Sequence, residues 1–70
     1  MNLLEIGQLI QKRRDSLLIK QEDLAELSGI TTKTIYMLEK GKGNPSFSTL
    51  VKILQVLGLE MTIQLQKKIE

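Results

Sequence analysis

Glycine and proline residues divide this 70-residue chain into short segments, and these breaks limit what the chain can fold into. Between the breaks, apolar residues recur every three or four positions, which is the period of one face of an α-helix. Seventy residues also lie near the lower limit of common domain sizes. We therefore expect one all-α domain of four to five short helices in residues 1–58, followed by a tail in residues 59–70.

The first two helices have recognisable ends. Asn2 and Glu5 form a capping-box pattern, which predicts a first helix from this point to about Ser16. A second helix is expected over residues 21–28, because Gly29 follows it and ends it. The apolar side chains expected to face inward from these two helices are Leu3, Ile6, Ile10, Leu17, Leu24, Ala25 and Leu27.

The next two helices begin at hydroxyl residues and end at glycines. The hydroxyl of Thr31 is expected to cap a third helix, which ends at Gly41. An Asn-Pro step then forces extended chain, and Ser46 caps a fourth helix that has Gly58 as its C-terminal cap. The inward side chains predicted for these helices are Ile35, Leu38, Leu50, Ile53, Leu54 and Leu57.

After Gly58 the apolar period changes from 3.6 to 2. Met61, Ile63 and Leu65 alternate with polar residues, which is typical of a half-buried strand. The chain offers no second strand candidate, and a lone strand leaves its backbone groups unpaired. We favour an antiparallel ribbon with a second copy, which makes the protein a homodimer. A frayed tail and a continuation of the fourth helix are the alternatives.

The composition excludes several kinds of chemistry. The chain has no Cys and no His, which removes thiol chemistry, disulfides, imidazole catalysis and nearly every zinc site. No paired acids in a plausible cleft and no Gly-rich phosphate loop are recognisable, so neither enzymatic activity nor a cofactor nor a metal is expected. No apolar run resembles a signal peptide or a membrane span. We therefore expect a cytoplasmic location and no membrane partner.

Charge is distributed in blocks along the chain. In order, the blocks are Lys12, Arg13, Arg14 and Lys20; then Glu22, Asp23 and Glu26; then Lys33, Lys40, Lys42 and Lys52. The net charge is only +2, so the two basic blocks are more informative than the total. They favour a protein with one basic face. The acidic block is interpreted as a solvated helix face whose charges suit a helix N-terminus.

Residues 21–31 fit two short helices joined by a turn, as in a helix-turn-helix. Ala25 is small where the helices would cross, and Gly29 lies in the turn. At about 100° per residue, one face of the third helix is apolar and the other lacks acids. Lys can donate to guanine and Thr can contact a thymine methyl group, so the outward face suits base edges in the major groove. The outward residues are Thr32, Lys33, Tyr36, Met37 and Lys40.

The chain resembles Xre/Cro-type helix-turn-helix proteins, which are related to lambdoid phage repressors. The resemblance covers about residues 5–58. It is carried by Gln21-Glu22-Asp23-Leu24-Ala25, Gly29-Ile30-Thr31, Thr34-Ile35, Leu38-Glu39-Lys40-Gly41 and Asn44-Pro45-Ser46. It implies a lambda-repressor-like fold and a dimer that binds a palindromic operator in double-stranded DNA.

The resemblance also implies a role for particular residues. It implies base contacts at Thr32, Lys33, Tyr36 and Met37 and phosphate contacts at Gln21, Lys20, Thr31, Thr34, Lys40 and Lys42. It suggests a pair between Arg14 and Glu39, which we interpret as structural. Lys20 and Met37 depart from the family, in which a hydroxyl residue and a polar residue are common at these positions.

The segment 57–63 is similar to the end of HipB-type antitoxins. This second resemblance implies C-terminal strands that pair across the dimer, repression of the protein's own operon and a HipA-like kinase toxin as a partner. An alternative hypothesis is a protein-interaction module, a toxin-neutralising antitoxin or a scaffold, in which DNA binding is secondary. Glu22, Asp23 and Glu26 would then be candidates for its contact surface.

Overall fold

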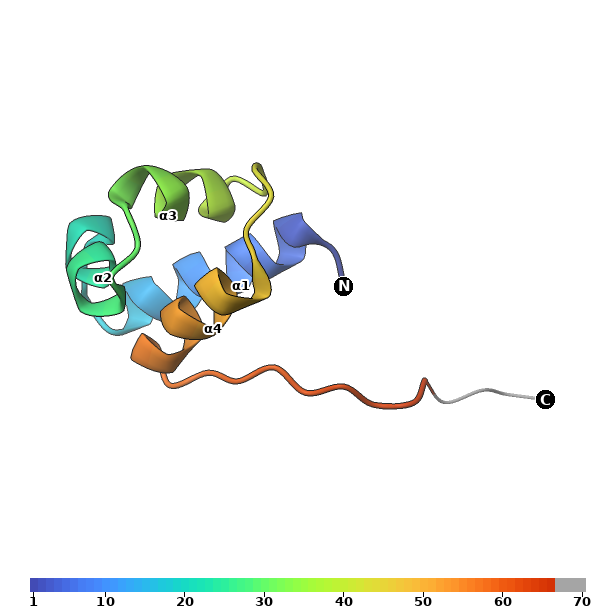
Figure 1. The fold of residues 1–70 in the computed structure, drawn as a ribbon. Coiled ribbons are helices and arrows are strands. Elements are labelled where there is room, and N and C mark those ends of the chain that lie inside the picture. Colours follow the sequence, from blue (N-terminus) through green and yellow to red (C-terminus); the bar gives the residue numbers. More distant parts are fainter. Residues whose placement is uncertain (67–70) are drawn as a thin grey trace.

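The computed structural model describes residues 1–66, and within them the chain forms four helices. These are α1 (Leu3–Ser16), α2 (Gln21–Ser28), α3 (Thr32–Glu39) and α4 (Phe47–Val56). Helix α3 packs on α1 and α2, and α4 packs on α2. In Figure 1, α3 lies along the top of the molecule, with α1 and α4 beneath it and α2 at the left. The predicted all-α domain is confirmed, with four helices.

The predicted starts of α1, α3 and α4 agree with the structure, whereas α3 ends at Glu39 and α4 at Val56, each two residues before the glycine predicted to end it. The backbone N–H of Glu5 donates to Asn2 Oδ1 (2.9 Å), and the backbone N–H of Asn2 donates to Glu5 Oε1 (3.0 Å), which completes the capping box. Thr31 Oγ1 accepts a hydrogen bond from the backbone N–H of Thr34, and Ser46 caps α4 in the same way. These bonds satisfy amides that have no partner in the helix itself.

The residue just before helix α2 offers no side-chain acceptor to cap it. Lys20 occupies the N-cap position, where its ammonium group has only donors. The side chain of Asp23 compensates in part, because its Oδ2 accepts from the backbone N–H of Lys20 at 2.9 Å. The start of α2 therefore has only half of a capping box, namely the hydrogen bond from the N-cap backbone N–H to the side chain of residue N3.

A single aliphatic core lies between the helices. Its buried members are Ile10, Leu24, Ile35, Leu38, Ile53, Leu54 and Leu57. The prediction that Leu27 faces inward is wrong, since its side chain is 63% exposed. The side of α2 that faces the core carries Leu24, Ala25 and Ser28. At about 100° per residue, Leu27 lies well away from that side. Leu17, also expected inside, is exposed just after the last turn of α1.

Helices α1 and α3 approach each other closely at Gly7. A Cβ atom added at this residue would lie 2.0 Å from the backbone oxygen of Leu38. Gly7 lowers helix propensity, but its missing side chain allows this contact. The residues around Gly7 in the sequence do not show which helix crosses there, so its role is not predictable from local sequence.

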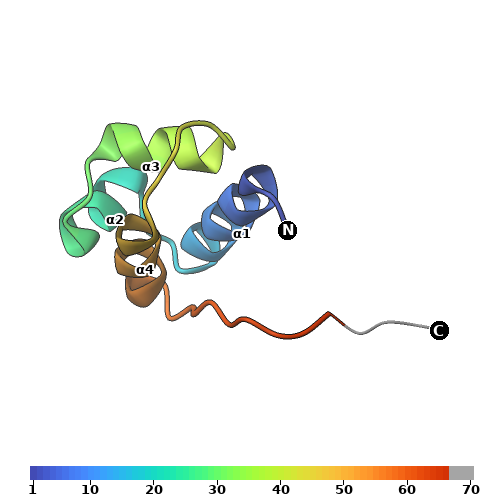
Figure 2. The same cartoon turned by 45° about the vertical axis from the view of Figure 1, so that its right-hand side comes forward.

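The tail leaves the helical body after α4. Helix α4 ends at Val56 and Gly58 has a left-handed backbone with φ of 70°, so the alternative in which the fourth helix continues into the tail is wrong. Residues 59–66 form neither helix nor strand in this single chain, and Figures 1 and 2 show them projecting beyond the helices. A strand needs a neighbour for its backbone hydrogen bonds, and one copy provides none among residues 1–66. Residues 67–70 of the predicted tail lie outside the described residues.

Candidate nucleic-acid interface

The turn between α2 and α3 is fixed by short hydrogen bonds. Gly29 has φ of 74°, in the left-handed region that favours glycine, and its N–H donates to Ala25 O at 2.9 Å. Ser28 Oγ donates to Leu24 O at 2.6 Å and accepts from the backbone N–H of Ile30 at 3.3 Å. Ile30 is half-buried against the core. The start of α3 is therefore held in a defined position relative to α2.

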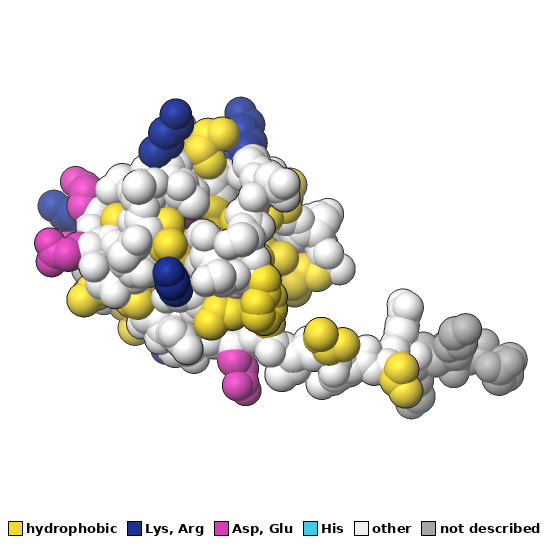
Figure 3. All heavy atoms as spheres, in the orientation of Figure 1, with side chains coloured by type: hydrophobic (Ala, Val, Ile, Leu, Met, Phe, Trp, Pro, Cys, Tyr) yellow, Lys and Arg dark blue, Asp and Glu magenta, His cyan; other side chains and the backbone are white. Residues whose placement is uncertain are grey.

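One side of α3 is buried and the other is exposed. Ile35, Leu38 and Glu39 are buried. Of the outward residues predicted to contact bases, Thr32, Lys33 and Tyr36 are exposed and Met37 is half-buried. Because Glu39 is inside, the outward side of α3 carries no acidic side chain. Figure 3 shows Lys and Arg side chains along the top, where α3 lies, and acidic side chains at the left over α2.

Two lysines extend this surface past the end of the helix. Lys40 is the C-cap of α3, and its Nζ lies 5.5 Å from the centroid of the Tyr36 ring. A cation over an aromatic face is attracted by the ring quadrupole, so the contact favours one arrangement of both side chains. Lys42 is exposed in the turn that follows, and its backbone N–H donates to Met37 O at 2.9 Å.

A hollow of about 220 Å³ lies between α3 and the loop that leads to α4. Its lining includes Lys33, Thr34 and Met37 from α3 and Lys42 and Asn44 from the loop. Asn44 is exposed, lines the same hollow as Lys33 and offers amide donors and an acceptor. In the sequence, the Asn-Pro step indicates only extended backbone, so it gives no signal that Asn44 lies at this surface.

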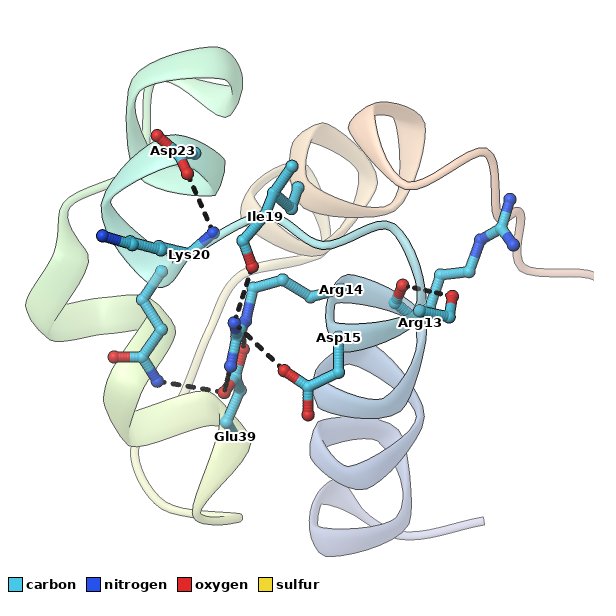
Figure 4. Close-up of polar contacts among 9 residues, drawn as sticks. Arg13, Arg14, Asp15, Ile19, Lys20, Asp23 and Glu39 are labelled. Carbon is cyan, nitrogen blue, oxygen red and sulfur yellow. Dashed lines mark hydrogen bonds and ion pairs between the residues drawn. The ribbon is translucent and has the colours of Figure 1, made fainter.

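Beneath the exposed face, Arg14 and Glu39 form a bidentate ion pair (Figure 4). Arg14 Nε donates to Glu39 Oε2 at 2.7 Å, and Nη2 donates to Oε1 at 3.0 Å. The third guanidinium nitrogen, Nη1, donates to the backbone oxygen of Ile19 at 2.9 Å and lies 3.3 Å from Asp15 Oδ1. The structure thus brings the predicted pair together and ties α1 to the end of α3.

This environment keeps Arg14 charged. The hydrogen bond to Glu39 raises the pKa of Arg14, burial opposes this, and the charges of Glu39 and Asp15 raise the pKa further. A raised pKa of a cation stabilises the fold at pH values below the ordinary pKa of the group. The contribution of Arg14 to stability is therefore lost only at strongly alkaline pH.

Gln21 also joins this cluster. Its Nε2 donates to Glu39 Oε1 at 3.0 Å. An amide NH₂ group has two N–H donors, so this bond leaves one for another partner at the start of α2. Lys20 and Thr31 are exposed, and Thr34 is half-buried with its Oγ1 accepting from Thr31 Oγ1 at 2.9 Å. The phosphate contacts assigned to these residues and to Lys40 and Lys42 stay predictions.

Two short helices joined by a glycine turn, with the second helix exposed and free of acids on its outward side, define a helix-turn-helix protein. The helix-turn-helix family model matches residues 10–64. The chain belongs to this family, and the resemblance to Xre/Cro-type proteins is confirmed. In residues 1–66, no helix is long and apolar enough to cross a membrane.

Relatives with curated names are transcriptional regulators. An "uncharacterized HTH-type transcriptional regulator" of Methanothermobacter thermautotrophicus is 44% identical over 52 residues, which cover 74% of this chain and 75% of that protein. The HTH-type transcriptional regulator PuuR of Escherichia coli is 38% identical over 56 residues, which cover 80% of this chain but only 30% of PuuR.

A solved structure shares the fold. The restriction-modification controller protein C.AhdI from Aeromonas hydrophila superposes with a TM-score of 0.78 at 31% sequence identity. The superposition covers 83% of this chain and 88% of C.AhdI.

Proposed function

We propose that this protein is a sequence-specific DNA-binding repressor that acts as a homodimer on a palindromic operator. The observation that carries the proposal is the exposed, acid-free side of α3, held outward by the buried ion pair of Arg14 and Glu39. Lys33 and Thr32 lie in the first turn of α3, from which side chains reach base edges most easily. The names of the relatives support a regulatory role.

The base contacts belong to the first two turns of α3, at Thr32, Lys33, Tyr36 and Met37. The phosphate contacts belong to the periphery of the same face, where lysine ammonium groups are exposed. In the dimer, two copies of α3 enter successive major grooves about 34 Å apart, so the operator is an inverted repeat. Since each neutralised phosphate releases counterions, binding weakens steeply as salt rises.

A footprint on the DNA upstream of the protein's own gene tests this proposal directly. The purified protein is titrated on that DNA at several salt concentrations, with a scrambled fragment as control. We expect protection of two half-sites one helical turn apart on the native fragment alone. Equal protection of both fragments would contradict sequence-specific binding, and no protection at low salt would contradict DNA binding by the protein alone.

We propose further that the operator controls the protein's own operon. The similarity of residues 57–63 to HipB-type antitoxins supports an antitoxin function, in which a HipA-like kinase toxin is the second partner. The exposed acidic side chains of α2, Glu22, Asp23 and Glu26, are the candidate surface for that partner. Co-purification with a kinase encoded beside this gene tests the antitoxin function, and loss of co-purification in a triple Glu22→Gln, Asp23→Asn, Glu26→Gln variant tests the surface.

A further inference from the structure

Met37 lies where the exposed side of α3 meets the loop that leads to α4. Its side chain is half-buried and lines the hollow of about 220 Å³ together with Leu38 and Pro45. These three side chains are apolar, whereas Lys33 and Lys42 are basic members of the same lining, and the lining includes no acid. The hollow therefore combines an apolar patch with a basic margin, next to the surface proposed for DNA.

The thioether of Met37 limits what this residue can read in DNA. It has no hydrogen-bond donor, and its sulfur is only a weak acceptor. In the major groove the base edges present donors and acceptors, and the apolar group among them is the C5-methyl group of thymine. A polar edge placed against the thioether would lose its water without gaining a partner. A favourable base contact of Met37 is therefore a contact with a methyl group.

We infer that Met37 and the hollow beside it read the 5-methyl group of a pyrimidine in each operator half-site. Two pyrimidines of DNA carry this group, namely thymine and 5-methylcytosine. The inference rests on the proposed function and deepens it, because it assigns a chemical group to one base contact and makes operator binding responsive to cytosine methylation.

The loop beside Met37 is held against the end of α3 before any DNA binds. The backbone N–H of Lys42 donates to Met37 O at 2.9 Å, and that of Gly41 donates to Leu38 O at 2.9 Å. Gly43 has φ of 90°, and a Cβ atom added there would lie 3.9 Å from the Met37 Cβ. Because glycine has no side chain, the thioether keeps open space on its loop side. A methyl group thus enters a hollow that already exists, and little loss of loop entropy opposes binding.

The polar lining accepts both pyrimidines but favours thymine. Next to the C5 position, thymine presents its O4 acceptor and cytosine presents its N4 amino group. The amide of Asn44 has both an acceptor oxygen and N–H donors, so one of its two orientations matches either base. Lys33 and Lys42 have donors only, which suits the O4 of thymine. We therefore expect thymine to bind best and 5-methylcytosine to bind better than cytosine.

The position of Lys33 predicts what stands near the methyl group. Lys33 lies four residues before Met37, on the same side of α3. Four residues of helix rise about 6 Å and successive base pairs are about 3.4 Å apart, so the two side chains reach bases about two pairs apart at most. Since Lys donates to guanine O6 and N7, each half-site is expected to place a guanine within two base pairs of the methyl group.

The first test replaces thymine by uracil, which removes the methyl group and leaves the hydrogen-bonding edge unchanged. Operator duplexes carry this replacement at one thymine position of both half-sites at a time and are titrated with the protein by fluorescence anisotropy. Burial of a methyl group contributes roughly fourfold in affinity, so two half-sites give on the order of 15-fold. We expect a loss of this size at the position that Met37 contacts.

Variants of Met37 assign the effect to this side chain. Met37→Gln keeps a similar length but replaces the thioether by an amide, whereas Met37→Leu keeps an apolar side chain. We expect Met37→Gln to bind the thymine and uracil operators within about twofold of each other, and Met37→Leu to retain the preference for thymine. The matched control is Lys42→Ala, which should weaken binding to both operators and leave their ratio unchanged. Circular dichroism verifies that each variant is folded.

A second set of duplexes distinguishes the two sources of the methyl group. At the sensitive position the T·A pair is replaced by C·G, with the cytosine either unmodified or methylated at C5. We expect methylation to tighten binding by about the same factor as thymine over uracil, and the difference to disappear in Met37→Gln. A methyl effect at thymine without one at cytosine would support a thymine contact and contradict the response to cytosine methylation.

The outcomes separate this inference from the proposed function. Equal binding of the thymine and uracil operators at every position would overturn the inference, and so would a preference for thymine that Met37→Gln retains in full. Either result leaves the proposed function intact when the footprint shows protected half-sites. A protein that protects no DNA at low salt would contradict the proposed function, and the inference with it.

Discussion

The two sides of α3 use polar side chains in opposite ways. On the inner side, Glu39 accepts hydrogen bonds from Arg14 and Gln21, and its side chain is almost completely buried. On the outer side, Lys33 and Lys40 form no ion pair within residues 1–66. Charges whose partners lie inside the chain fix the position of the helix, whereas charges without such partners are available to another molecule.

The largest loss of stability is expected from a substitution on the inner side of α3. Glu39→Ala leaves the Arg14 guanidinium buried without its carboxylate, and breaking a buried pair from one side costs about 3–5 kcal/mol. A domain of this size has a total stability of only about 4–10 kcal/mol, so the variant should be largely unfolded. Urea unfolding followed by circular dichroism measures the loss.

The matched control is Glu26→Ala, which removes an exposed acid of α2 and should change the free energy of unfolding by less than about 0.5 kcal/mol. The double variant Arg14→Met, Glu39→Leu should recover most of the loss, since it leaves no buried charge alone. If the double variant is as unstable as Glu39→Ala, the pair does not account for the effect.

Gly7→Ala disturbs the packing of α3 on α1 without removing a polar side chain. The added methyl group would meet the Leu38 oxygen at 2.0 Å, so α1 and α3 must separate. We expect a loss of about 3 kcal/mol, near the upper end of typical overpacking costs. In contrast, Gln8→Ala at the next, exposed position of α1 should be nearly neutral. A Gly7→Ala protein as stable as the wild type would show that α1 and α3 do not approach so closely.

Lys33→Ala tests the outer side. We expect it to reduce discrimination at one base pair of each half-site by about 1–3 kcal/mol. The free energy of unfolding should change by less than about 0.5 kcal/mol, because Lys33 is exposed. Competition binding with operators mutated one base pair at a time measures the discrimination.

Lys42→Ala is the control for Lys33→Ala. A phosphate contact carries no sequence information, so its loss should weaken binding to all sequences alike and reduce the slope of log K against log salt by about 1. If Lys33→Ala also weakens specific and random DNA equally, Lys33 does not contact a base.

The parts of the fold that the sequence predicts are those that depend on neighbours along the chain. The caps at Asn2, Thr31 and Ser46 each involve residues three positions apart, so the pattern alone locates them. The exposed side of α3 follows from helical periodicity in the same way. The close contact at Gly7 depends instead on how the helices cross in space, and a strand at Ile63 depends on a second chain.

For the same reason, only part of the candidate site can be predicted from the sequence. Exposure of Lys33 and Tyr36 is set within one helix and is predictable. The bond from Gln21 to Glu39 joins residues 18 positions apart, and the hollow that Asn44 and Lys33 both line depends on the path of a loop. Neither has a signal in local sequence.

The smallest effect is expected at Leu18, between α1 and α2. Leu18 has φ of 59° and its side chain is 92% exposed, so it combines a left-handed backbone with no burial. A left-handed residue with a Cβ atom costs roughly 1–2 kcal/mol, which glycine avoids. Leu18→Gly loses some of this gain to the greater entropy of the unfolded chain, so we expect a stabilisation of up to about 1 kcal/mol. Leu17→Gly is the control, because Leu17 has φ of −89° and should lose stability. A destabilised Leu18→Gly protein would mean that an exposed side chain still contributes to the stability of the fold. That result would contradict the comparison at α3, where only the side chains of the inner side are expected to stabilise the fold.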